Sequence, residues 1–279
     1  MNERIFKDSL KNRDGSETYN AKVIEYDTEL HITSYMKSIE RGKVQDAQTN
    51  FRKSYKNVER TEKEEMHCIN QSLNRTKNNI YYLARSNTWE YFFTLTFNQQ
   101  VWDSADYELV VKLLGKFLNN FKNRKNKDLL YLFVPELHKD GEHYHFHGLV
   151  SNCEQMNFVD SGHVTSTGEV IYNVSDWKYG FSTATIVQDT DRVSGYITKY
   201  VTKDMCRVLK NKRRYYVSGN AERAETKLCV LDPDELFNEY GDRINYLNSQ
   251  DVPAAYQRCT YIEVSKQCQN ILWNQNVTS

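Results

Sequence analysis

The chain has 279 residues, of which 39% are hydrophobic, and its 37 basic and 37 acidic residues give a formal net charge of zero. This length suits one large domain or a catalytic domain with appendages, and the neutral balance argues against a protein that coats nucleic acid non-specifically. No apolar run approaches ~18 residues, no apolar signal core follows the first methionine, and the six cysteines are scattered. We therefore expect a cytoplasmic protein with no membrane partner.

Residues 1–88 are expected to form an accessory region. Residues 21–32 alternate loosely between apolar and polar side chains, which predicts a strand pair. Thr61 and Glu64 have the spacing of a capping box, and apolar residues then recur at helical spacing. The sequence therefore predicts strands followed by a helix that begins near Thr61.

From residue 89 the strand signal becomes denser. Residues 91–97 are aromatic and β-branched, as in a buried strand. Asp103 or Ser104 can cap a following helix, whose apolar stripe extends from Val110 to Phe121. A strand and a helix are therefore expected between residues 91 and 121.

A β-hairpin is expected next. Residues 129–137 predict one strand, residues 139–141 a turn, and residues 142–150 the returning strand. Later elements are expected as strands at 169–174, 181–187, 213–218 and 260–264, and as a helix from Asp189 or Asp191 to about Leu209. This order predicts an α+β fold with an antiparallel sheet and helices packed on one face.

The returning strand of the hairpin carries an unusual group of histidines. His143, His145 and His147 alternate with Tyr144 and Phe146. Residues two apart in a strand point to the same face, so the three imidazoles are expected to lie together. Neutral imidazole is the commonest metal ligand, and a polar strand without a metal is the alternative.

A metal site with two histidines needs at least one more ligand. The hairpin brings Glu136 of the facing strand close to His143 or His145. One carboxylate and two imidazoles leave open positions on a divalent ion, and this mixed ligation suits Mn²⁺ or Mg²⁺. Glu136, His145 and His147 are thus the predicted ligands, with His138 or His143 as the alternative to Glu136.

Tyr196 and Tyr200 form the second candidate constellation. Residues i and i+4 are neighbours on a helix, and Lys199 and Lys203 each follow a tyrosine by three residues. A phenol has a pKa of about 10, so it needs a nearby cation and a metal to attack a phosphodiester. Packing of aromatic side chains is the alternative, because the chain has 20 tyrosines.

Together these residues resemble the HUH endonucleases, and among them the rolling-circle replication initiators of bacterial plasmids and single-stranded DNA phages. The resemblance rests on residues 145–149, His-Phe-His-Gly-Leu, on the upstream Glu136 and on the downstream Tyr196 and Tyr200. Residues 93–97 resemble the first motif of the family. The resemblance covers residues 89–218, and residues 219–279 remain as a C-terminal extension.

The resemblance implies a sheet of ferredoxin-like or RRM-like type and a metal-dependent nickase. Tyr200 would attack single-stranded origin DNA, form a 5′-phosphotyrosine link and free a 3′-hydroxyl that primes rolling-circle replication. Tyr196 would accept the strand in a later transfer, and Lys199 and Lys203 would assist. A host helicase and a host polymerase are the expected partners.

Three other functions compete with this interpretation. A transposase or mobilisation nickase of the same superfamily would use the same chemistry. A metal-dependent oxygenase would use His145, His147 and Glu136 on a β-barrel and leave the tyrosines without a role. A non-catalytic nucleic-acid-binding module would explain the basic segments and the aromatic residues but not the clustered histidines.

Overall fold

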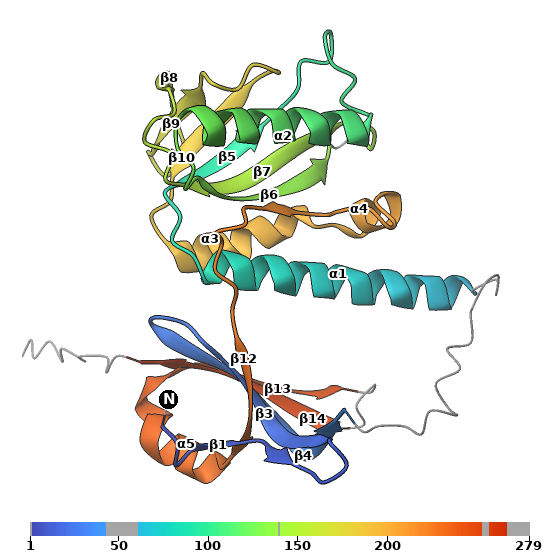
Figure 1. Ribbon diagram of the computed structural model, residues 1–279, viewed down its shortest axis with the longest axis vertical. Coiled ribbons are helices and arrows are strands. Elements are labelled where there is room, and N and C mark those ends of the chain that lie inside the picture. The colour runs from blue at the N-terminus through green and yellow to red at the C-terminus, as the bar shows by residue number, and fades with distance from the viewer. Residues whose placement is uncertain (1, 43–60, 139, 253–256, 267–279) are drawn as a thin grey trace, which may run out of the picture. The chain divides into compact units, whose positions relative to one another are not determined.

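The computed structural model describes residues 2–42, 61–138, 140–252 and 257–266 (Figure 1). The chain divides into two compact units. The first unit combines residues Met1–Asn57 with Ala224–Ser279, and the second is Val58–Arg223. The domain boundaries expected at residues 88/89 and 218/219 remain a prediction. The chain passes from one compact unit to the other at residues 57/58 and 223/224.

The first unit contains an antiparallel sheet that combines strands from both ends of the chain. Within the described residues the order is β1-β12-β3-β4-β14-β13, and β2 also pairs with β3. The elements are β1 (Phe6–Asp8), β2 (Leu10–Lys11), β3 (Glu17–Glu25), β4 (Glu29–Arg41), β12 (Thr226–Leu231), α5 (Pro233–Tyr240), a 3₁₀ turn (Gly241–Arg243), β13 (Ile244–Val252) and β14 (Gln257–Ser265). The predicted strand pair over residues 21–32 corresponds to β3 and β4, and the strand at 260–264 lies within β14.

The second unit contains the predicted hairpin and both candidate constellations. Its described sheet has the order β11-β6-β7-β5-β10-β9-β8, with antiparallel neighbours throughout. The elements are α1 (Glu62–Arg85), β5 (Tyr91–Leu95), α2 (Tyr107–Arg124), β6 (Leu130–Leu137), β7 (Tyr144–Ser151), β8 (Phe158–Val164), β9 (Val170–Val174), β10 (Ser182–Ile186), α3 (Thr190–Ile197), the 3₁₀ turn η1 (Thr198–Tyr200), α4 (Lys203–Val208) and β11 (Tyr216–Val217). The strand β8 was not predicted, because its polar and glycine-containing sequence lacks an apolar alternation.

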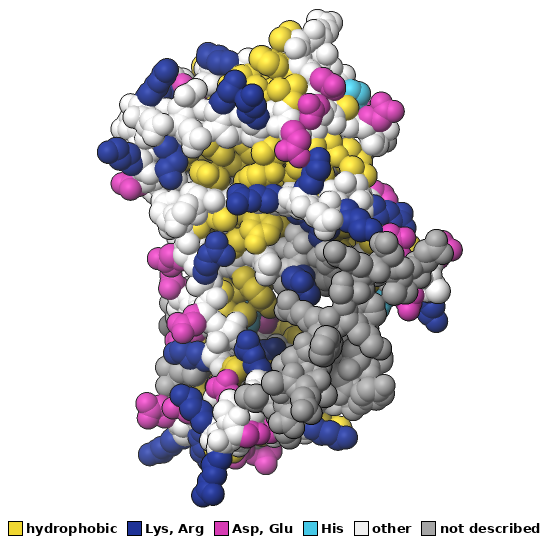
Figure 2. Space-filling view, turned by 45° about the vertical axis from the view of Figure 1, so that its right-hand side comes forward, with side chains coloured by type: hydrophobic (Ala, Val, Ile, Leu, Met, Phe, Trp, Pro, Cys, Tyr) yellow, Lys and Arg dark blue, Asp and Glu magenta, His cyan; other side chains and the backbone are white. Residues whose placement is uncertain are grey.

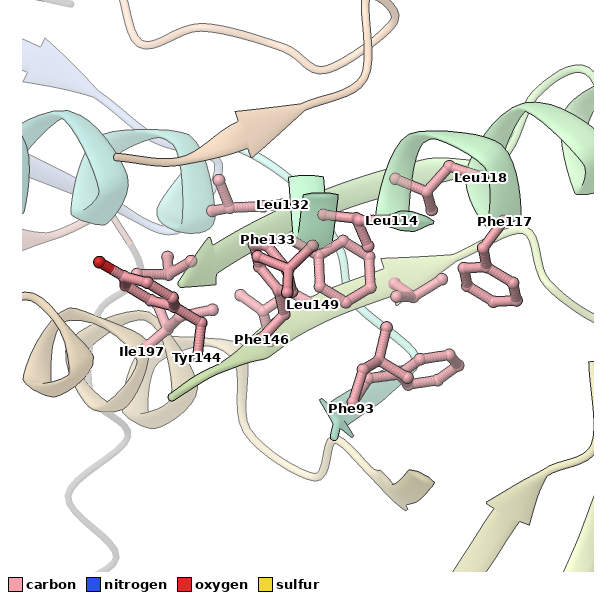
Figure 3. Packing of buried hydrophobic residues seen from close by; sticks show 14 of the residues in the cluster. Phe93, Leu114, Phe117, Leu118, Leu132, Phe133, Tyr144, Phe146, Leu149 and Ile197 are labelled. Atoms are coloured by element: carbon pink, nitrogen blue, oxygen red, sulfur yellow. The ribbon is translucent and has the colours of Figure 1, made fainter. Parts of the chain in front are cut away.

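Helices cover both faces of this sheet, so the expectation of helices on one face is wrong. Helix α2 packs on the face that carries Tyr144 and Phe146, while α1, α3 and α4 lie on the opposite side (Figure 1). Both faces of β7 are largely buried, because helices cover each of them. Figure 3 shows the first face, where Leu114, Phe117 and Leu118 of α2 pack against the aromatic residues of the central strands. Among the described residues no helix is both long and apolar enough to cross a membrane.

At Gly148 the strand β7 has no room for a side chain. A Cβ atom at this position would lie 2.2 Å from Cδ1 of Phe133, whose ring is fully buried on the adjacent β6. Real Cβ atoms do not approach another carbon this closely. The glycine that follows His147 therefore lets the Phe133 ring pack across the histidine strand.

Capping side chains set where two helices begin, one as predicted and one three residues later than Asp103. Helix α1 begins at the predicted capping box, with Thr61 as its N-cap. Helix α2 is capped by Asp106, which accepts hydrogen bonds from the backbone of residues 108 and 109, and not by Asp103 or Ser104. The reason is that Asp103 closes a separate turn by accepting from the Ala105 backbone N–H.

The helix predicted from about residue 189 to residue 209 is in fact interrupted. Helix α3 ends at Ile197, η1 follows, and the backbone of Val201 and Thr202 is extended before α4 begins. The Thr202 hydroxyl accepts from the Met205 N–H and thereby caps a new helix. Threonine competes well for such capping positions, which is why the chain leaves the helical path there.

Candidate active site

The register of the hairpin places Glu136 directly opposite His145. Strand β6 pairs with β7 so that Glu136 faces His145 and Val134 faces His147. One carboxylate oxygen of Glu136 lies 2.6 Å from Nε2 of His145 and 2.7 Å from Nε2 of His147. The ligand atoms of the three residues all lie within 4.8 Å of one another, a grouping able to hold a metal ion. The structure thus brings together the three residues predicted as ligands.

Burial and charge favour an ionised carboxylate at Glu136 and a neutral imidazole at His147. Desolvation raises the pKa of Glu136, but hydrogen bonds from His145 and His147 outweigh it and lower this pKa to about 2. Desolvation lowers the pKa of His147 despite the opposing attraction of Glu136. Neutral imidazole and ionised carboxylate are the forms that bind metal ions. The donor set of one oxygen and two nitrogens therefore fits a divalent cation such as Mn²⁺.

Thr94 completes the surroundings of His147, and it was not among the predicted site residues. Its hydroxyl lies 3.1 Å from Nδ1 of His147, the ring nitrogen that faces away from Glu136. The pairing of β5 with β7 sets Thr94 directly opposite His147. The signal was present in the sequence, since residues 93–97 were recognised as a motif, but the register that pairs the two residues was not predictable from it.

Both candidate tyrosines lie on the histidine face. The rings of Tyr200 and His147 are stacked, with centroids 3.5 Å apart and an interplanar angle of 15°. Tyr196 meets Tyr200 edge to face at 5.6 Å, and Phe92 contacts both tyrosines. Tyr196 is 42% exposed, whereas Tyr200 is half-buried. The pair thus lies next to the Glu136–His145–His147 cluster although the helix between them is broken.

The environment of Tyr200 favours the protonated phenol. Desolvation, followed by the hydrogen bond and charge of Tyr196 and the charge of Glu136, raises the pKa of Tyr200 above its ordinary value of 10.0. Lys199 places Nζ 4.7 Å from the centroid of the Tyr196 ring, a cation–π contact. Lys203 is exposed at the first residue of α4. Lys199 therefore contacts Tyr196 and not the candidate nucleophile Tyr200.

His143 and His138 are held apart from the carboxylate of Glu136. Strand β7 begins at Tyr144, so His143 precedes the strand. Its Nδ1 lies 2.8 Å from a carboxylate oxygen of Asp140. His138 lies 3.4 Å from the same oxygen and contacts the His145 ring edge to face at 5.5 Å. Among the described residues, the cluster suited to a metal includes Glu136 and neither of these histidines.

Comparison with known proteins points to DNA replication. Residues 90–205 match the model of a family described as replication-associated protein ORF2. The matched segment contains Thr94, Glu136, both cluster histidines and both tyrosines. No curated protein and no solved structure matches the chain. The family match supports a role as a replication initiator.

Proposed function

We propose that this protein is a metal-dependent endonuclease that nicks single-stranded origin DNA and so initiates rolling-circle replication. The observation that carries the proposal is the stacking of Tyr200 on His147, because it sets a candidate nucleophile against a cluster suited to a divalent ion. The family match supplies the class of substrate. The resemblance to HUH endonucleases supplies the expected chemistry.

Glu136, His145 and His147 would hold the ion, Mn²⁺ or Mg²⁺. The Nε2 atoms that would bind the metal now donate hydrogen bonds to the carboxylate, so in a metal-bound form the ring proton of each neutral imidazole would stand on Nδ1. A bound divalent ion would polarise the phosphate that is attacked and offset the negative charge that develops there. The protein supplies the arrangement of the three ligands and the shielding of His147 from water.

Tyr200 would carry out the covalent step. Its phenolic oxygen forms a bond to the phosphorus of the scissile phosphodiester, and the bond from phosphorus to the 3′-oxygen breaks. The phenol loses its proton, and the departing 3′-oxygen gains one to become a 3′-hydroxyl. The product is a 5′-phosphotyrosine link. Attack by a 3′-hydroxyl on the same phosphorus reverses the exchange and rejoins the strand without a nucleotide cofactor.

Tyr196 and the two lysines have proposed supporting roles. Tyr196 is exposed and touches the Tyr200 ring, so it is within the same aromatic group and accessible to a second strand. It would accept the strand in the terminating transfer. Lys199 and Lys203 would attract phosphates of the bound strand. A host helicase and polymerase would act on the freed end.

The deciding experiment looks for a covalent protein–DNA product. The full chain is incubated with a single-stranded oligonucleotide of the replicon's origin and Mn²⁺ or Mg²⁺, and the product is separated on a denaturing gel. We expect an adduct that a chelator abolishes and that mass spectrometry maps to Tyr200.

Two matched variants assign the tyrosines. Tyr200→Phe should give no adduct, whereas Tyr196→Phe should still nick but fail to complete strand transfer. Equal loss in both variants would refute this division of roles, and an adduct that survives in Tyr200→Phe would refute Tyr200 as the first nucleophile. Absence of any adduct with a cleavable origin strand and bound metal would refute the nickase itself.

A further inference from the structure

A pocket unrelated to the histidine cluster lies beside the C-terminal half of α2. It has a volume of 230 Å³ and lies between α2 and residues 176–179, which precede β10. The aromatic residues Phe117, Phe121 and Tyr179 are among those that line it. Helix α2 packs on the sheet face opposite the histidines, so the pocket belongs to the other side of the sheet (Figure 1). The pocket therefore needs an explanation of its own.

The rim of the pocket is cationic. Arg124, Lys125 and Lys178 line it, and Asp176 is the single acidic residue among its lining side chains. Asp176 is already engaged, because Lys125 places Nζ 3.0 Å from its carboxylate. Within the described part of the chain, Arg124 and Lys178 are exposed and make no ion pair. Two positive charges are thus available to an anionic ligand.

The solvent side of α2 extends this positive surface. Its 18 residues include four basic side chains and one acidic side chain, Glu108, which stands in the first turn. Lys112, Lys116 and Arg124 are exposed at intervals of four or eight residues, so they follow one side of the helix. Figure 2 shows Lys and Arg side chains gathered beside hydrophobic ones at the level that α2 occupies in Figure 1. The solvent side of α2 is therefore locally basic, although the net charge of the whole chain is zero.

We propose that this pocket and the adjacent α2 surface form a second binding site for single-stranded DNA. The choice of DNA as the ligand rests on the proposed function. A pocket of about 230 Å³ is smaller than the about 300–1,000 Å³ that enclose a drug-sized ligand, so we expect it to take a single base of a longer strand. An unpaired base stacks on an aromatic ring, and the flanking phosphates meet Arg124 and Lys178. Paired bases in duplex DNA cannot offer their faces in this way.

A site on the opposite side of the sheet from the tyrosines would hold a segment of strand that is not being cut. Its affinity needs neither a metal nor a nucleophile. The protein would thereby keep hold of the DNA after the nick, while the histidine face carries out the transfer. The role of this second site would therefore be to retain the nicked strand, separately from the cleavage reaction.

The test measures DNA binding by fluorescence anisotropy in a buffer with chelator, so that cleavage plays no part. The probe is a labelled single-stranded oligonucleotide, and the variant is Arg124→Ala combined with Lys178→Ala. A strand loses about 0.7 in the slope of log affinity against log salt for each phosphate contact removed, so we expect the slope to fall by about 1.4. Tyr179→Leu should weaken binding about five-fold or more, since stacking on one ring contributes about 1–3 kcal/mol.

The control removes two positive charges elsewhere. Lys7 and Lys11 are exposed in the first unit, and Lys7→Ala with Lys11→Ala should leave the slope as in the wild type. Equal losses in the control and the pocket variant would overturn the proposal, as would wild-type affinity in the pocket variant. Each variant is first checked for a wild-type thermal transition.

A second readout uses the wild-type protein and so avoids any question of folding. An oligonucleotide containing 5-iodouracil is irradiated on the protein, and the crosslinked peptide is identified by mass spectrometry. We expect a peptide that contains Tyr179, and crosslinks confined to the histidine face would overturn the site. Covalent adduct formation at Tyr200 is scored separately, so failure of the nickase and failure of this second site remain distinguishable.

Discussion

Replacement of Thr94 by valine tests how the protein prepares His147 for a metal. Without metal, Nε2 of His147 donates to the Glu136 carboxylate, so Nδ1 is unprotonated and accepts from the Thr94 hydroxyl. With a metal on Nε2 the proton must stand on Nδ1, which then donates to the same hydroxyl. A hydroxyl can both donate and accept a hydrogen bond, whereas the valine methyl group, which is of nearly equal size, can do neither.

The expected magnitude follows from burial. His147 is 6% exposed, so water does not readily replace the hydroxyl at Nδ1. An unsatisfied buried polar atom costs about 1–3 kcal/mol, and loss of a partner behind a ligand weakens metal affinity about 10- to 100-fold. We expect Thr94→Val to weaken Mn²⁺ binding by this factor in calorimetric titration at neutral pH and to reduce cleavage at limiting Mn²⁺.

Thr96→Val is a matched control, because it makes the same change two residues away. The Thr96 hydroxyl donates to the backbone carbonyl of Phe181 and does not contact the histidines. We expect Mn²⁺ affinity to stay within about two-fold of the wild type in this variant. If Thr94→Val kept full Mn²⁺ affinity with an intact fold, or if both variants lost it equally, the role assigned to Thr94 would be refuted.

Three further predictions test packing, pH dependence and the division between binding and cleavage. Gly148→Ala should destabilise the protein by about 1–3 kcal/mol in urea unfolding, because the added carbon meets the Phe133 ring, whereas Gly115→Ala in α2, with nothing within 4 Å, should be neutral or stabilising. Desolvation opposes ionisation of Asp176, but hydrogen bonds lower the pKa of this residue below 3.8. The ionised carboxylate therefore stabilises the fold above pH 3.8, and this stabilisation is lost as the pH falls through the lowered pKa. The free energy of unfolding of Asp176→Asn should accordingly depend less on acid pH than that of the wild type. His145→Ala should abolish metal-dependent cleavage while anisotropy shows DNA binding within about two-fold of the wild type, and parallel loss of both would contradict a purely catalytic cluster.

Local patterns in the sequence were sufficient for the hairpin that holds the cluster. Alternation of imidazole and aromatic residues defined a strand, and the turn residues beside Gly141 set its partner, so the proximity of Glu136 to His145 was predictable. Alternation does not show where a strand begins, and His143 precedes β7. The carboxylate of Asp140 draws His143 into the turn, a contact that no periodicity reveals.

Features that depend on distant pairing were not predictable. Thr94 reaches His147 through the pairing of β5 with β7, across 53 residues of sequence. The apolar spacing between residues 189 and 209 fits one helix, and only the capping hydroxyl of Thr202 shows why the backbone leaves it. The sheet of the first unit combines β3 with β12, and a single sequence carries no signal for partners so far apart.

That last pairing has a consequence for how the protein can be divided. The second unit is inserted between β4 and β12 of the first, so two covalent crossings join the units. A single protease cut at either crossing leaves the other intact, and release of residues 58–223 requires both. Deletion from residue 224 onward would remove β12 from between β1 and β3 and break the first sheet, whereas the inserted segment carries its own core and is suited to separate expression.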